Sequence, residues 1–132
     1  MLNEDNTMRR PDVAVKLILR CGKEVLMLKH QNGAFDFPGG RIEWAESPKF
    51  ALKRELEEEL NYNLADPVKF FDIWNYVSRD NSRHSIFLYY FKEISEKPDL
   101  RSTEKAEVLW LSKEDLKPII KNPLFLDKIF SL

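Results

Sequence analysis

The earliest strong pattern along the chain is the apolar segment 13–19, which reads VAVKLIL. Apolar residues fill its alternate positions and most positions between them, which predicts a strand covered on both faces. A second apolar segment, 25–28, follows the connection 20–23, whose glycine permits a hairpin turn. We therefore expect two neighbouring strands, followed by a loop over 30–36 and a sharp turn at 37–40.

The next segment carries the signals that begin and end a helix. Ser47 suits the N-cap and Pro48 the first helical position, while Asn61 suits the left-handed residue that ends many helices. Between them, leucines at every fourth position from 52 to 60 form one stripe. The pattern predicts a helix over 48–60 that packs its leucines against a sheet.

The second half of the chain predicts three more strands and two short helices. The strands fall at 68–78, 84–93 and 106–111, and the helices begin after Ser112 and at Asn122-Pro123. Together with the earlier elements, this order predicts an α/β domain in which helices pack against a mixed sheet.

Length and charge narrow the class of protein. The 132 residues fit one domain, which we expect over 11–132 after a flexible arm at 1–10. Because 21 basic and 22 acidic side chains nearly cancel, nucleic acid is disfavoured as a partner. The chain lacks an apolar run long enough for a membrane, and its one cysteine, Cys21, fits a reducing cytoplasm. A homodimer is left open.

The acidic residues of the predicted helix carry the first sign of chemistry. Glu55, Glu58 and Glu59 fall together on an arc beside the leucine stripe. Like charges at this spacing cost about 0.2–0.5 kcal/mol per pair, and Lys53 and Arg54 offset this only in part. Two interpretations stay open: a solvated acidic helix face, since Glu is a favoured surface helix former, or a divalent cation held by the carboxylates.

The spacing upstream of these acids favours the second interpretation. The chain runs from a glycine through five residues to an acid, and then through seven residues to an Arg-Glu pair. This pattern resembles the Nudix box, G-x5-E-x7-R-E-U-x-E-E-x-G-U, in which U is a bulky aliphatic residue. Asn61 and Tyr62 replace the last Gly and the last aliphatic residue, and neither change removes a carboxylate. The matching positions are Gly40, Glu46, Arg54, Glu55, Leu56, Glu58 and Glu59.

The resemblance implies a fold, a reaction and a cofactor. The fold is a Nudix-type α/β/α sandwich with a mixed sheet. The reaction is hydrolysis of a phosphoanhydride bond in a nucleoside diphosphate-linked substrate, foremost a nucleoside triphosphate cleaved to monophosphate and pyrophosphate by a MutT-like enzyme. Mg²⁺ is the cofactor, with Mn²⁺ as a substitute. Nucleotide sugars, dinucleoside polyphosphates and RNA 5′ ends stay open as substrates, as does a nucleotide-sensing module without catalysis.

The resemblance also implies roles for the helical residues. Glu55, Glu58 and Glu59 match metal ligands, and Glu55 also matches the position discussed as the base that activates water. Arg54 matches the residue that orients these glutamates through ion pairs. Glu55, Glu58 and Arg54 are therefore the helical part of the predicted catalytic set.

Residues outside the helix complete the predicted site. Glu46 and Gly40 match positions that support the motif, and Gly39 matches the turn whose carbonyl binds metal, where a side chain would block the approach of the ion. A further acid from a late loop is also implied. Glu104 and Glu107 are the candidates, and we favour Glu104 because a loop residue has more freedom to reach the metals than a strand residue.

Several other residues stay ambiguous. Phe35, Trp44 and Trp74 suit stacking on a base, although aromatic residues at this density are more often core. His84 suits either a contact with phosphate or base, or a surface position where a strand begins. Cys21 has no neighbouring basic pair or second cysteine that would mark a nucleophile.

Overall fold

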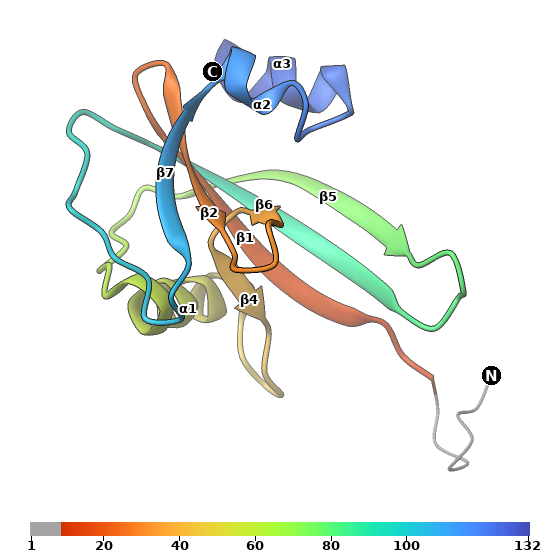
Figure 1. Ribbon diagram of the computed structural model, residues 1–132. Coiled ribbons are helices and arrows are strands. Elements are labelled where there is room, and N and C mark those ends of the chain that lie inside the picture. The colour runs from red at the N-terminus through yellow and green to blue at the C-terminus, as the bar shows by residue number, and fades with distance from the viewer. Residues whose placement is uncertain (1–8) are drawn as a thin grey trace.

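Strand β1 (Asp12–Cys21) is the central element of the computed structural model, which describes residues 9–132 (Figure 1). It pairs with β2 (Glu24–Lys29) near its C-terminal end and with β4 (Gly39–Arg41) near its N-terminal end, both antiparallel. It also pairs in parallel with β6 (His84–Ile94) along its whole length. The chain that leaves β2 therefore returns beside β1 as β4.

The remaining strands extend the sheet on both sides of this centre. One lies beyond β6, and two others pair with β2, all of them antiparallel. They are β5 (Lys69–Val77), β3 (Phe35–Asp36) and β7 (Glu107–Ser112). The sheet is mixed, as the order of the elements predicts.

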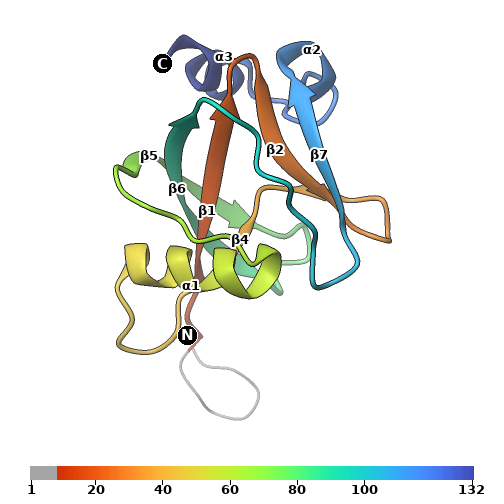
Figure 2. The same cartoon turned by 90° about the vertical axis from the view of Figure 1, so that its left-hand side faces the viewer.

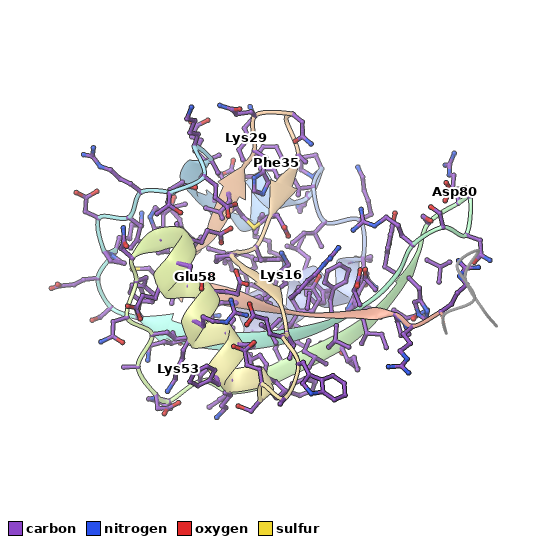
Figure 3. The ribbon with its side chains drawn as sticks, turned by 90° about the horizontal axis from the view of Figure 1, so that it is seen from below. Lys16, Lys29, Phe35, Lys53, Glu58 and Asp80 are labelled. Carbon is purple, nitrogen blue, oxygen red and sulfur yellow. The ribbon has the colours of Figure 1, made fainter. Side chains whose placement is uncertain are left out.

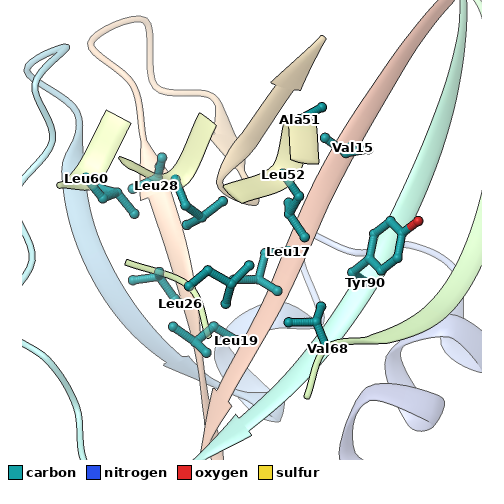
Figure 4. Close-up of a cluster of buried hydrophobic side chains, with 12 residues drawn as sticks. Val15, Leu17, Leu19, Leu26, Leu28, Ala51, Leu52, Leu60, Val68 and Tyr90 are labelled. Carbon is teal, nitrogen blue, oxygen red and sulfur yellow. The ribbon is translucent and has the colours of Figure 1, made fainter. Parts of the chain in front are cut away.

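The central strand is covered on both faces. Val15, Leu17 and Leu19 belong to the core cluster that packs under the long helix (Figure 4), whereas Ile18 belongs to a second cluster on the other face. Successive side chains of a strand point to opposite faces, so an apolar run without polar alternation is what this position requires. The prediction from 13–19 is confirmed.

Helix α1 (Pro48–Leu60) has the predicted bounds. The Ser47 hydroxyl accepts a hydrogen bond from the Phe50 N–H at 3.3 Å, and Asn61 takes the left-handed conformation with φ of 52°. The Asn61 N–H donates to the Glu57 carbonyl at 2.9 Å, which satisfies a carbonyl at the end of the helix. The leucine stripe is buried against the sheet, as predicted.

Two shorter helices cover the opposite face. Helix α2 (Lys113–Leu116) begins with a capping box, and α3 (Pro123–Ser131) begins where the Asn122 side chain accepts two backbone N–H groups. Phe125 belongs to the same core cluster as Ile18. Figure 2 shows α1 well separated from α2 and α3, with strands of the sheet running between them. This is the expected α/β/α sandwich.

Two predictions about the segment between β2 and α1 were wrong. The predicted loop over 30–36 contains the short strand β3, and the predicted turn at 37–40 ends in strand β4. Gly39 has φ of 143°, and a Cβ atom there would lie 2.0 Å from the Val15 carbonyl oxygen. The glycine therefore allows β4 to lie directly against β1, where a side chain would collide with the backbone.

Part of the predicted N-terminal arm lies outside the described residues. Arg9 and Arg10 are described and exposed, whereas residues 1–8 are not described, so the boundary between arm and domain stays a prediction. None of the helices between residues 9 and 132 is long and apolar enough to cross a bilayer.

The left-handed conformation of Asn61 makes a prediction about stability. Asn61→Gly should leave the free energy of unfolding unchanged within error, whereas Asn61→Ala should lower it by about 1–2 kcal/mol, because a Cβ-bearing residue without a polar side chain pays for this conformation. Denaturant titrations measure both values. Asn63, two residues on and without a positive φ, provides the control, and an equal loss in Asn63→Ala would contradict the explanation.

Candidate active site

The acids of α1 meet the sheet at the two glycines that begin β4. Glu59 is buried, and its Oε1 atom accepts a hydrogen bond from the Gly39 N–H at 3.3 Å. Burial raises the pKa of Glu59 to about 7, against the lowering effects of the Gly39 N–H and the Lys16 charge. A carboxylate in this position is costly to ionise without a nearby cation.

Glu55 lies against the second glycine. A Cβ atom on Gly40 would lie 2.4 Å from Cδ of Glu55 and 2.5 Å from its Oε2 atom. The resemblance implied that a side chain at this turn would block an ion. In the structure, the atoms that a side chain would meet are the Val15 carbonyl at Gly39 and the Glu55 carboxylate at Gly40.

The guanidinium of Arg54 joins the acids of the helix to the loop before it. Its Nη1 atom lies 2.9 Å from Glu55 Oε1 and 3.2 Å from Glu58 Oε2. Its Nε and Nη2 atoms bind both carboxylate oxygens of Glu46, at 2.6 and 2.9 Å. The same guanidinium donates to the Arg41 carbonyl at 3.0 Å. Arg54 therefore pairs with two of the three predicted metal-binding acids, Glu55 and Glu58, and Figure 3 shows Glu58 on this helix.

Glu46 is the most firmly held acid of the site. Its side chain is 7 % exposed, and the bidentate bond from Arg54 lowers its pKa to about 2, with help from the Glu43 N–H. The pairing in turn raises the pKa of Arg54 above its ordinary value. Glu46 thus fixes the loop and the guanidinium, and both of its oxygens are already engaged.

The loop between β6 and β7, which carries Glu104, contacts the C-terminal half of α1. The Thr103 N–H donates to the Glu59 carbonyl at 2.8 Å, and the Thr103 hydroxyl donates to the Glu58 carbonyl at 2.9 Å. The negative charge of Glu104 adds to the raised pKa of Glu59, after the larger effect of burial. Glu107 instead lies on β7 opposite Lys29 and is exposed.

The donor chemistry of these acids fits a hard divalent cation. All the candidate side-chain donors are carboxylates, which are the ligands that Mg²⁺ prefers. Glu55 and Glu58 converge on Arg54, so a cationic group already lies where the two carboxylates meet. Across residues 9–132, however, no three acidic, histidine or cysteine side chains already share one metal-sized position. Arg54 binds Glu55 and Glu58, and the Gly39 N–H binds Glu59, so these carboxylates would have to turn towards a cation to bind it.

An aromatic pocket of about 680 Å³ opens between the sheet and the start of α3. Tyr89 packs edge-on against Phe37 and Phe125, with ring centroids 5.8 and 5.0 Å apart, and burial raises its pKa to about 12. The residues that line the pocket include Phe37, Trp74, Tyr89, Ile120, Asn122 and Phe125. Flat apolar walls with an amide among the lining residues suit a heterocyclic ring.

The structure distinguishes the residues that the sequence left with two possible roles. Trp74 lines this pocket, whereas Phe35 packs against the core cluster of the same face. Trp44 is 93 % exposed and does not line it. His84 is exposed at the start of β6, with its Nε2 atom 2.5 Å from Asn75 Oδ1. Cys21 is half-buried at the end of β1.

Sequence reasoning missed the other walls of the pocket. Tyr89 and Phe37 come from separate strands and loops, and Asn122 was recognised only as a helix cap. Their only sequence signal is the density of aromatic residues, including the Tyr89-Tyr90 pair, which core packing produces equally well.

A comparison with known protein families finds the NUDIX domain over residues 8–131, so the chain belongs to this family. The resemblance of the sequence is thereby confirmed. The fold is that of MutT-type members: the crystal structure of a MutT NUDIX hydrolase from Burkholderia pseudomallei superposes with a TM-score of 0.75 at 23 % identity. The superposition covers 91 % of this chain and 98 % of that one.

Two curated relatives resemble shorter parts of the chain. The 8-oxo-dGTP diphosphatase of Escherichia coli (strain K12) is 34 % identical over 58 residues, which are 40 % of this chain and 45 % of that protein. The 8-oxo-dGTP diphosphatase of Proteus vulgaris is 46 % identical over 35 residues, 26 % of this chain and 31 % of that protein. The chain thus matches less than half the length of these relatives.

The contact between Gly40 and Glu55 makes a prediction. Gly40→Ala should lower the free energy of unfolding by about 1 kcal/mol, because the added methyl group overlaps the Glu55 carboxylate, which must turn away from Arg54. Most of that cost should disappear when Gly40→Ala is made in a Glu55→Ala background. Denaturant titrations of the four proteins measure the coupling, and the same cost in both backgrounds would contradict the contact.

Proposed function

We propose that this protein hydrolyses a nucleoside triphosphate to the monophosphate and pyrophosphate, and that it needs Mg²⁺ to do so. The observation that carries the proposal is the closeness of two unlike features. Gly39, which binds Glu59, lies two residues from Phe37, which lines the aromatic pocket. A ligand with an aromatic ring in the pocket would therefore have its phosphates beside the acids.

The acids of α1 would hold the cation. When bound, Mg²⁺ neutralises phosphate oxygens and lowers the pKa of an attacking water molecule. Glu55, Glu58 and Glu59, with the backbone carbonyl of Gly39, are the proposed ligands. Their family positions, the oxygen-only donor set and the burial of Glu59 support this assignment. Members of the family typically require a divalent metal.

The other residues would orient these groups. Arg54 fixes the direction of Glu55 and is itself fixed by Glu46, so the carboxylates are ordered before a substrate arrives. Glu55 is our candidate for the base that takes a proton from water, because it occupies the family position discussed for this role. Catalysis would then rest on positioning and electrostatics, as phosphoryl transfer requires.

The base would lie in the aromatic pocket, where Trp74 and Tyr89 offer flat surfaces and Asn122 offers an amide. The Asn122 oxygen already accepts the Leu124 and Phe125 N–H groups, so its NH₂ group is the part that can donate to an acceptor on the edge of a purine. The names of the two curated relatives, both 8-oxo-dGTP diphosphatases, support a guanine nucleotide as the first candidate.

A substrate panel with Mg²⁺ tests the proposal. We expect a nucleoside triphosphate to give monophosphate and pyrophosphate, and the activity to disappear in chelator. Glu58→Gln and Glu59→Gln should each reduce turnover by orders of magnitude, because each removes a charged ligand. Glu57→Gln, an exposed acid on the same helix, is the matched control and should keep full activity.

The panel should also contain 8-oxo-dGTP, a nucleotide sugar, a dinucleoside polyphosphate and a 5′-triphosphate RNA, with products resolved chromatographically. Preference for one of these last three would change the proposed substrate, whereas the proposed reaction, hydrolysis of a phosphoanhydride bond, would stand. Binding without turnover would identify a sensing module. Undiminished activity without metal would refute the proposed cation site.

The extra acid makes a separate prediction. The hydrogen bonds of Thr103 hold its loop against α1, and Glu104 is the next residue along that loop. This supports Glu104 as the acid that acts beside Glu59. Glu104→Gln should therefore lower turnover, whereas Glu107→Gln, on an exposed strand position, should not. Both are measured in the same assay with thermal unfolding as a check on folding. Loss of activity in Glu107→Gln alone would reverse the assignment.

A cytoplasmic location and a homodimer stay predictions. The second would use exposed apolar side chains of the edge strand β5, among them Phe70 and Ile73.

A further inference from the structure

Lys16 is a buried cation that the proposed chemistry has not yet used. It lies on β1, where its neighbours Val15 and Leu17 point towards α1, so its own side chain points to the opposite face. The residue is 8 % exposed and lies between apolar residues, Val15 before it and Leu17 after it. Long ammonium side chains are rarely buried unless they are paired or functional.

The register of the sheet puts Lys16 between the acids and the aromatic pocket. On one side its strand partner is Gly39, whose N–H binds Glu59, and on the other side its partner is Tyr89, which lines the pocket. Neighbouring strands are about 4.8 Å apart. Gly39, Lys16 and Tyr89 thus form one continuous row from the acids to the pocket, and Figure 3 labels Lys16 in its setting.

The ammonium group has spare hydrogen-bonding capacity. Its Nζ atom binds Asp36 Oδ2 at 2.7 Å and the Phe37 carbonyl at 3.4 Å. An ammonium carries three N–H donors, so these two acceptors leave one donor within the part of the chain that the structure describes. The side chain retains 11 % exposure, which keeps it within reach of a ligand, and its charge also acts on Glu59.

We propose that Lys16 is a substrate-binding residue, whose remaining N–H group binds an oxygen of the phosphate attached to the nucleoside. This rests on the proposed function. A substrate with its base beside Tyr89 and its terminal phosphates beside Glu59 has that first phosphate between them, where Lys16 lies. Asp36, which is 44 % exposed, holds the ammonium and neutralises part of its charge. The alternative is that Lys16 only ties Asp36 to β1.

Binding measurements in chelator separate these roles, because metal ions then contribute nothing. The probes are the four deoxynucleoside monophosphates and their four nucleosides, titrated calorimetrically. In the unsubstituted protein, at least one monophosphate should bind about tenfold more tightly than its nucleoside, the low end expected for a charge-assisted hydrogen bond. In Lys16→Met this ratio should fall to about one, while affinity for the nucleoside stays within about twofold.

The control is Lys53→Met, which removes a lysine–aspartate pair of 3.2 Å on the exposed side of α1 and should leave the ratio unchanged. Equal losses of monophosphate and nucleoside affinity in Lys16→Met would mean that Lys16 only holds Asp36 in place, and this would overturn the proposal. Should that variant fail to fold, the unsubstituted protein still decides, because absence of any preference for monophosphate over nucleoside overturns it. The substrate panel is independent: a chain without turnover that keeps the phosphate preference would refute the proposed reaction and not the role of Lys16.

Discussion

The close approach of β4 to β1 on one side and to α1 on the other is the constraint on which the site depends. At Gly39 the backbone of β4 leaves no room for a Cβ atom beside the Val15 carbonyl, and at Gly40 it leaves none beside the Glu55 carboxylate. The two glycines therefore let β4 pair with the central strand while it also lies against the acidic helix. Because the Gly39 N–H is then directed at Glu59, the same approach brings backbone dipoles and carboxylates together.

The gathered acids are tolerated because Arg54 connects them. One guanidinium binds Glu46, Glu55 and Glu58, with a carbonyl of β4 as a further acceptor. A planar guanidinium with five donors suits this task better than an ammonium would. Glu59 lies outside this network, and burial raises its pKa. The Gly39 N–H and the Lys16 charge offset the burial of Glu59 only in part, so the proposed cation would contribute most at this acid.

The two halves of the proposed substrate site come from the two faces of the sheet. Helix α1 supplies acids from one face, while Tyr89 and the start of α3 supply the pocket on the other, and β4 is where the two approach one another. Each half needs support from its own core cluster, which explains why a small domain keeps helices on both faces. Lys16 lies on β1, whose neighbouring strands carry Gly39 and Tyr89, so it lies between the acids and the pocket.

The sequence by itself determined the local elements and the acid group. The bounds of α1 follow from Ser47, Pro48 and Asn61, the double coverage of β1 follows from its unbroken apolar run, and the spacing of the acids carries the resemblance to the family. These signals depend on residues close together in the sequence, so they can be recognised without knowledge of the fold. Strand β4 was missed because a glycine pair is read as a turn unless the partner strand is known. The pocket and the position of Lys16 depend on strand register and on the packing of α3, which are long-range, and only the tertiary structure decided them.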